Sequence, residues 1–301
     1  MRTISPPLAL FLLVVVPAVS ACGSQAGTPL TAQPGLSVAS VLGGCRTLDY
    51  AQNSSANQLN GIDNRGEIAG SGTPAGGYVI HPPYRQNDFR AENYPGGFAT
   101  SVASANDAHI LVGFYRDGKG DTEGFVNVHG AWTGVKSNSN LLELLDINET
   151  GTIVGFYADR YGVDHAFEGP FRRIKPPGGI SDVAAGINER GHLVGYMTIA
   201  SGAVEGFLFE GGAYTDLLYP DATNTAAFGI NGRDEIVGSY SDSAGATHGF
   251  LLTSPRKNPH WESFDESQAN GFTRISGIND HSEFVGSYRD ASGVMHGFLC
   301  R

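Results

Sequence analysis

Charged residues are scarce in this chain. Asp, Glu, Lys and Arg together make up 16% of its 301 residues, and 30 of them are acidic against 19 basic. The formal net charge of −11 argues against nucleic acid as a partner, because binding to nucleic acid needs a basic face that replaces counterions. An acidic balance of this kind mainly favours solubility.

Catalytic signatures are missing as well. The sequence holds neither a Gly-x-Ser-x-Gly nucleophile motif nor a phosphate-binding loop. Carboxylate pairs for glycoside hydrolysis could be drawn from the 30 acidic residues, but any chosen pair is arbitrary. We therefore predict no catalytic residue, no metal ligand and no cofactor.

The apolar run near the N-terminus is short. Leu8–Val16 has nine residues, too few to cross about 30 Å of hydrocarbon as a helix, and Pro17 then ends it. With Arg2 as its positive start, the segment predicts an export signal over residues 1–21.

The end of that signal, Val19-Ser20-Ala21-Cys22, resembles a bacterial lipobox, in which the signal is cut before the cysteine and the thiol is lipidated. Cys22 is therefore predicted to anchor the protein to a membrane, with residues 22–42 as lipid attachment and flexible tether. The protein would then lie in the cell envelope, on the outer membrane or the cell surface. The alternative is ordinary cleavage after Ala21 and a secreted protein.

Cysteine is rare, with only three residues in the chain. If Cys22 carries the lipid, Cys45 and Cys300 remain, one at each end of the exported domain predicted over residues 43–301. An exported protein sits where disulfides persist.

What the sequence has in abundance is glycine, 42 residues, and much of it belongs to an internal repeat. Six copies share one register, exemplified by "GINGRDEIVGSYSDSAGATHGF" at 229–250. In every copy an Asn or Asp lies seven residues before a Gly. In the last five copies that Gly lies eleven residues before a small residue, which is followed directly by Phe. The marked positions, spaced 43, 42, 40, 43 and 48 residues apart, are Asp63, Asn106, Asn148, Asn188, Asn231 and Asn279.

Each copy divides into four strand-length pieces joined by turn residues, and no segment has a helical run of ten residues or more. Four-stranded units of about 43 residues repeated six times are typical of propeller blades. We therefore predict an all-β fold, a six-bladed β-propeller of four-stranded antiparallel blades. A stacked β-solenoid is the alternative.

The last copy stops after its third strand, and residues 43–50 resemble an orphan fourth strand. The N-terminal strand is therefore predicted to complete the last blade and close the ring, which removes open sheet edges. In this alignment Cys45 takes an aromatic position that faces Cys300, and we predict a disulfide between them. A bridge closing a loop of about 250 residues is worth about 4–5 kcal/mol in the entropic model.

These motifs resemble the bacterial extracellular repeat proteins of the HAF family, named for a His-Ala-Phe triplet. The triplet stands once as His165-Ala166-Phe167, with variants at His248-Gly249-Phe250 and His296-Gly297-Phe298. The resemblance covers about residues 43–301 and implies export and a repeat fold. It implies no activity, because no catalytic residues are associated with the repeat.

The three histidines belong to a Tyr-x-Asp-x-x-Gly-x-x-His pattern, which invites a metal or acid–base interpretation. A structural interpretation is favoured: Asp starts a hairpin turn, Gly takes its positive-φ corner, and His packs or hydrogen-bonds across to the Tyr strand. Residues repeated around a ring do not converge on one catalytic cluster. We accordingly assign His165, His248 and His296 to structure, together with Asn106, Asn148, Asn188, Asn231 and Asn279.

Two loops depart from the repeat, "HPPYRQNDF" at 81–89 and "TSPRKNPHW" at 253–261. Both fall between third and fourth strands and mix Pro, aromatic and basic residues. Candidate contacts to a ligand or partner are Tyr84, Arg85, Arg256, Lys257 and His260, although loop drift explains these residues equally well.

The sequence thus predicts a monomeric binding or scaffolding module at the cell envelope, whose partner is an envelope protein or a carbohydrate. The rival class is a carbohydrate-active enzyme, a hydrolase or lyase with a site in the propeller channel or on one rim. Polar residues unique to single copies and converging on the channel mouth would favour the enzyme.

Overall fold

The computed structural model describes residues 44–301, so the predicted signal, Cys22 and the whole predicted tether lie outside the described residues. The described chain is all-β, with 24 strands and a single short 3-10 helix, η2 (Gln86–Asp88). No helix among these residues has the length and apolar character to span a membrane.

The strands pair in sequence order into antiparallel groups, which we number as units. Units 1 to 3 comprise β2 (Ala56–Ile62), β3 (Ile68–Thr73), β4 (Gly76–Ile80) and β5 (Phe89–Ala91); β6 (Phe98–Ala105), β7 (Ile110–Arg116), β8 (Thr122–Val128) and β9 (Ala131–Val135); and β10 (Leu142–Ile147), β11 (Ile153–Ala158), β12 (Asp164–Glu168) and β13 (Arg172–Arg173).

Units 4 and 5 are sheets of the same form, and the last three strands are joined by the first. These units comprise β14 (Gly179–Ile187), β15 (Leu193–Ile199), β16 (Val204–Glu210) and β17 (Ala213–Leu217); β18 (Asn224–Ile230), β19 (Ile236–Ser241), β20 (Thr247–Thr253) and β21 (His260–Phe264); and, as unit 6, β22 (Thr273–Ile278), β23 (Phe284–Arg289) and β24 (Met295–Cys300) with β1 (Arg46–Thr47).

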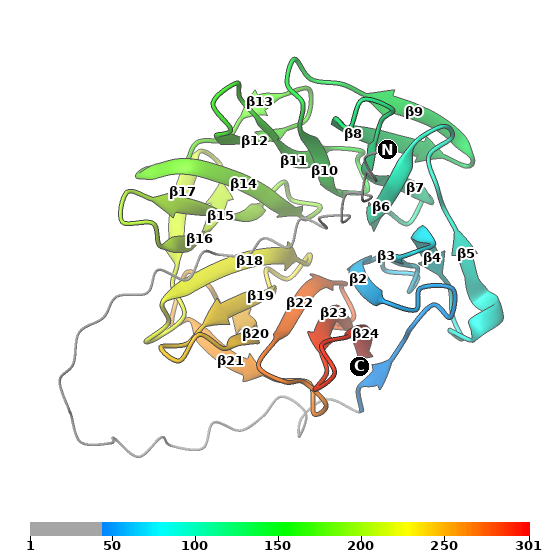
Figure 1. Ribbon diagram of the computed structural model, residues 1–301. Coiled ribbons are helices and arrows are strands. Elements are labelled where there is room, and N and C mark those ends of the chain that lie inside the picture. The colour runs from blue at the N-terminus through cyan, green and yellow to red at the C-terminus, as the bar shows by residue number, and fades with distance from the viewer. Residues whose placement is uncertain (1–43) are drawn as a thin grey trace, which may run out of the picture. The chain divides into compact units, whose positions relative to one another are not determined.

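The units follow one another around a common centre, with the first strand of each innermost (Figure 1). Each first strand contacts the first strand of the next unit, and β22 contacts β2. A single parallel pair, Ala56 with Met295, joins units 6 and 1 into one eight-stranded sheet.

The spacing between Gly and Phe in the repeat is explained by pairing between second and third strands. In unit 4, Gly195 on β15 pairs with Phe207 on β16, and units 5 and 6 pair Gly238 with Phe250 and Gly286 with Phe298. The fully buried Phe ring lies over the glycine, and a Cβ on Gly195 would lie 2.8 Å from the Phe207 ring. A side chain at this Gly would therefore displace the core aromatic residue.

The small residue before that Phe is explained by packing between units. A Cβ on Gly249 would lie 2.8 Å from the Ile275 side chain of the next unit, and one on Gly124 would lie 2.7 Å from Leu144. Across the boundary between units 6 and 1, a Cβ on Gly297 would lie 2.6 Å from the Leu59 side chain. The small residue therefore lets the third strand of one unit pack closely against the first strand of the next unit.

The repeated asparagines form bonds between units. The Nδ2 of each donates to the backbone carbonyl of its counterpart in the next unit at 3.0–3.2 Å, and Asn279 of unit 6 donates to Asp63 of unit 1. Their Oδ1 atoms accept from backbone amides of their own turns, as Asn188 does from Arg190 and His192. At the boundary between units 1 and 2 the residue is Asp63, which has no amide to donate.

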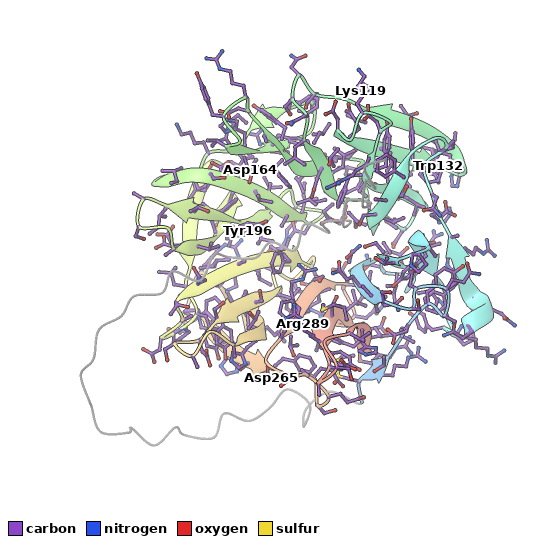
Figure 2. The ribbon with its side chains drawn as sticks, viewed as in Figure 1. Lys119, Trp132, Asp164, Tyr196, Asp265 and Arg289 are labelled. Carbon is purple, nitrogen blue, oxygen red and sulfur yellow. A yellow bond between two sulfur atoms is a disulfide. The ribbon has the colours of Figure 1, made fainter. Side chains whose placement is uncertain are left out.

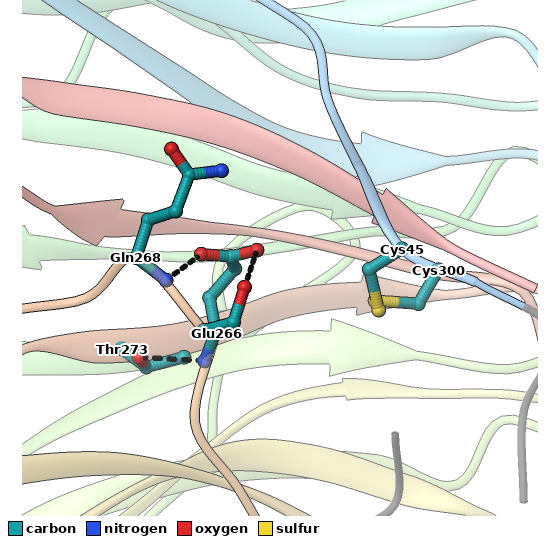
Figure 3. Close-up of a disulfide and its surroundings, with 6 residues drawn as sticks. Cys45, Glu266, Gln268, Thr273 and Cys300 are labelled. Carbon is teal, nitrogen blue, oxygen red and sulfur yellow. Dashed lines mark hydrogen bonds between the residues drawn. A yellow bond between two sulfur atoms is a disulfide. The ribbon is translucent and has the colours of Figure 1, made fainter. Parts of the chain in front are cut away.

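The two ends of the described chain meet in unit 6, and the predicted disulfide between Cys45 and Cys300 is confirmed (Figure 3). It links residues 255 positions apart. Beside it β1 pairs antiparallel with β24, Arg46 opposite Leu299. Further along, Leu48 and Tyr50 are buried in the core.

Candidate functional site

A polar cleft of about 520 Å³ lies where units 1 and 2 meet, at the boundary that lacks the asparagine bond. Unit 1 supplies most of its lining, and unit 2 supplies two residues. The lining residues are Asp63, Arg65, Glu67, His81, Pro82, Asn87, Asp88, Arg90, Asp107 and His109.

Glu67 is the most enclosed carboxylate of the cleft, with 5% of its surface exposed. His109 of unit 2 places Nδ1 2.7 Å from Oε2, and His81 of unit 1 places Nδ1 3.3 Å from the same oxygen. The two imidazole rings lie 6.1 Å apart. The carboxylate is thus held between two partly exposed histidines, one from each unit.

The outer wall of the cleft comes from the loop between β4 and β5. Its turn is fixed by Asp88, whose Oδ2 accepts from the backbone amide of Arg85 at 2.7 Å. Asn87 on this loop and Arg90 on β5 are exposed, as is Arg65 on the opposite turn. The cleft therefore offers carboxylates, guanidinium groups, imidazoles and an amide, a lining of alternating donors and acceptors.

Asp63 lies at the base of the cleft and is largely enclosed. Its Oδ1 accepts from the backbone amides of Arg65 and Glu67 at 2.9 and 2.7 Å, as the asparagines of the other units do. Burial raises the pKa of this carboxyl to about 7, and the nearby carboxylates of Glu67 and Asp107 add to the rise against the two backbone bonds. Near neutral pH, Asp63 therefore holds a proton for part of the time.

We expect Asp63→Asn to stabilise the protein at neutral pH, by about 1 kcal/mol, because it supplies the missing donor to the Asn106 carbonyl. In the wild type the raised folded-state pKa makes stability fall as pH rises from about 4 to 7. The gain from the substitution should therefore grow over that range. Denaturant unfolding of both proteins at pH 4.5, 6 and 7.5 measures it, and a pH-independent difference would contradict the assignment.

The predicted loop residues of unit 1 have different places. Tyr84 is buried rather than available to a ligand: its hydroxyl donates to the Gly66 carbonyl at 2.8 Å. Its ring is flanked by the guanidinium groups of Arg46 and Arg301 at 4.6 and 5.4 Å. Arg85 is exposed but does not line the cleft.

The loop of unit 5 is not brought to this cleft. Arg256 forms ion pairs with Glu210 of unit 4 and with Asp234 of unit 5, Nη1 to Oδ2 2.8 Å, so it joins two units. Lys257 is exposed, and His260 on β21 lies 3.3 Å from Glu262. The structure thus separates the two candidate loops, and only the first contributes to the cleft, through neighbours of the predicted residues.

The repeated histidines sit in the arrangement that the structural interpretation describes. His296 stacks on Tyr288 at 5.1 Å and lies between Asp49, 2.6 Å from Nδ1, and Asp290, 3.4 Å from Nε2. Gly293 has the positive φ of the turn. Burial lowers the pKa of His296, but hydrogen bonds and charge from Asp49 and Asp290 outweigh it and raise the pKa overall.

The repeat of unit 5 is built alike, whereas in unit 3 Arg173 takes the place of the second carboxylate. His248 lies between Asp242 and Asp265, 3.4 and 2.9 Å away, and its pKa is also raised, with the two carboxylates outweighing burial. His165 lies 3.1 Å from Asp159 and accepts from Arg173. These three positions are spread over units 3, 5 and 6. Within residues 44–301 no group of three or more His, Cys, Asp or Glu side chains is placed to hold a metal ion.

Sequence reasoning missed Glu67, His81 and His109. The signal for them lay in the first copy, which replaces the repeated asparagine by Asp63. The other five copies have Asn at this position, and the cleft lies at the boundary of the unit that has Asp63 instead.

The fold is β-propeller-like and similar to several solved structures. A mutant of Aleuria aurantia lectin in complex with Fucα1-6GlcNAc matches 82% of this chain and 91% of that one, with a TM-score of 0.51 and 8% identity. AofleA from Arthrobotrys oligospora, also a mutant, matches with 86% coverage of both chains, a TM-score of 0.51 and 11% identity.

TolB from Acinetobacter baumannii matches 83% of this chain, with a TM-score of 0.50 and 11% identity. The matched part spans 65% of the TolB chain. At these identities the likeness shows the fold alone. No protein-family model matches the sequence, and no curated protein matches it.

Proposed function

We propose that residues 44–301 form a six-bladed β-propeller closed by β1, and that the protein is a saccharide-binding module of the cell envelope. The blade count is supported by six units that share one register, and closure is supported by the pairing of β1 with β24 and by the Cys45–Cys300 disulfide. The packing of Gly297 on Leu59 supports the same arrangement.

The observation that carries the saccharide proposal is the cleft between units 1 and 2. Nine of its ten lining residues are polar or charged, and Pro82 is the exception, so the cleft favours a ligand that forms hydrogen bonds. It holds both acidic and basic groups, which disfavours a ligand with strong charge of one sign. A neutral saccharide fits, because its hydroxyl groups both donate and accept hydrogen bonds, and a cleft of about 520 Å³ lies in the size range of small-ligand sites.

Glu67 is the group expected to bind the sugar most strongly. Its carboxylate is nearly buried, and hydrogen bonds to a charged acceptor are about twice as strong as neutral ones. The two histidines hold it in place, and an enclosed position shields it from water. Arg65 and Arg90 at the exposed edge add donors.

We expect Glu67→Gln to weaken saccharide binding about tenfold or more, because a charged hydrogen bond is worth about 1.5–3 kcal/mol. Neutral hexoses, 6-deoxyhexoses and N-acetylhexosamines are titrated by calorimetry into the wild type and the variant. Glu262→Gln, on β21 of unit 5 and outside the cleft, is the matched control. The proposal fails if no neutral saccharide binds, or if both variants bind like the wild type.

We also propose that the protein is exported and held at the envelope by a lipid on Cys22, as a monomer. An exported location is supported by the disulfide, since cytosolic thiols are usually kept reduced. Acyl groups on Cys22 in the intact mass of protein taken from host membranes would agree with this. An unmodified, processed chain would indicate a secreted protein instead.

A further inference from the structure

Arg274 on β22 is a charged side chain without an opposite charge. It is surrounded by protein on most sides and partly open to water, and it forms no hydrogen bond or ion pair within residues 44–301. Its Nε is buried and unpaired, and so is the Oγ of Ser276 on the same strand. Burial lowers the pKa of Arg274, as expected where the charged form is poorly solvated.

The only partner of the Arg274 guanidinium among the described residues is an aromatic ring. Its central carbon lies 5.2 Å from the ring centre of Phe228 on β18. Phe228 in turn meets Tyr196 of β15 edge to face at 5.8 Å; Tyr196 is labelled in Figure 2. Both rings pack on the apolar cluster of Phe156, Val183 and Ala185, while part of each ring remains exposed.

Glu143 on β10 is another charged residue of the first strands, beside Asp146 on β10 and Asp182 on β14. Burial raises its pKa to about 8, with a further rise from Asp164 that Arg116 opposes. At neutral pH the group is therefore largely protonated and can donate a hydrogen bond. Burial raises the pKa of Tyr196, the carboxyl groups of Glu143 and Asp164 add to the rise, and Arg274 opposes it.

The repeat register shows that this pair is exceptional. Arg274 and Glu143 each lie five residues before the marked asparagine of their unit. The same position in the other four units is occupied by uncharged residues: Gln58, Ser101, Val183 and Ala226. The repeat does not require a charge here, and an enclosed charge without a partner lowers stability.

We propose that Arg274, Phe228 and Tyr196 form a second ligand site on the inner strands, which binds a small carboxylate carried by a ring with an apolar face. The carboxylate pairs with the Arg274 guanidinium, which can hold two oxygens at once. The ring of the ligand lies against Phe228 and Tyr196. Two ligand sources share this chemistry, a sugar acid and an aromatic acid.

The test is a titration, followed by NMR or calorimetry at pH 7, of the disulfide-bonded protein with D-glucuronate and with benzoate. D-glucose is the neutral ligand control. We expect at least one acid to bind, glucose to bind this site far more weakly, and Arg274→Gln to weaken acid binding about tenfold or more. Arg289→Gln is the matched variant, because Arg289 also lies over a ring, that of Phe272 at 5.1 Å, but belongs to β23.

Each result decides the proposal. Binding of glucuronate identifies the sugar acid, and binding of benzoate alone identifies the aromatic acid. Failure of both acids, or unchanged affinity in Arg274→Gln, overturns the site. Arg274→Gln should melt no lower than the wild type, because it removes an unpaired enclosed charge; a clear loss of stability would assign Arg274 to the fold and also overturn the site.

Two further variants separate this site from folding effects and from the cleft. Arg274→Lys keeps the charge but loses the planar fork, so it should bind the acid more weakly than wild type and better than Arg274→Gln. Glu67→Gln should leave acid binding unchanged, so the inner-strand site can fail or stand independently of the saccharide cleft.

Discussion

Replacing Cys45 and Cys300 together by serine is expected to lower the free energy of unfolding by about 5 kcal/mol, because the reduced chain regains the entropy of a loop of 255 residues. Other bonds of the N-terminal segment run to β23 and β24, among them those of Asp49 with His296 and with the Gly297 amide. β1 has two residues, its Thr47 Oγ1 lies 3.1 Å from the Tyr288 hydroxyl, and Leu48 donates to Gly297 at 2.9 Å.

Guanidinium unfolding of the double variant and the wild type, each with and without reductant, measures this effect. Reduced wild type should match the double variant, and reductant should not affect the variant. Hydrogen exchange should show the greatest loss of protection in β24, which becomes an open edge when β1 leaves. A loss below about 1 kcal/mol would mean that the residues around Leu48 and Tyr50 hold the strand unaided.

Gly195→Ala is expected to cost at least about 3 kcal/mol, the upper range for overpacked cores. A Cβ at this position would overlap the Val183 carbonyl oxygen on β14, and it would lie 2.8 Å from the Phe207 ring. The Val183 carbonyl belongs to the pair of strands β14 and β15, so it cannot move away without loss of a hydrogen bond between these strands. The ring is fully buried and has no free space to enter.

The matched control is Gly118→Ala. Gly118 lies in the hairpin between β7 and β8, where a Cβ would meet no atom within 4 Å and the backbone does not need a positive φ. Thermal unfolding should leave this variant near the wild type. A further variant, Gly195→Ala with Phe207→Leu, tests the cause: because the carbonyl clash remains, the smaller side chain should restore little stability. Full restoration would place the whole effect at the ring.

Much of the fold could be predicted from local pattern, because the repeat is local chemistry. The interval between Gly195 and Phe207 is the length of one hairpin, and the small residue before Phe207 marks the surface toward the next unit. The disulfide followed from the alignment of residues 43–50 with other fourth strands.

The cleft could not be predicted in the same way. Glu67 and His109 are 42 residues apart and belong to different units. Their contact depends on how closely two sheets approach at one boundary, a distance that no single repeat encodes. For the same reason Tyr84 and Arg256, exposed loop candidates in the sequence, became a buried hydroxyl and a bridge between units.

The position of β1 also changes how the assembly bears force. Because β1 belongs to unit 6 and the chain continues from it into β2 of unit 1, a covalent linker crosses the boundary between these units, as one crosses every other boundary. β1 and β24, which come from opposite ends of the described residues, meet inside the sheet of unit 6. Force between them acts along the strands on their hydrogen bonds and on the Cys45–Cys300 disulfide together. Pulling any two neighbouring units apart therefore loads peptide bonds, and the boundary at Asp63, which lacks its side-chain bond, can loosen only as far as residues 92–97 allow.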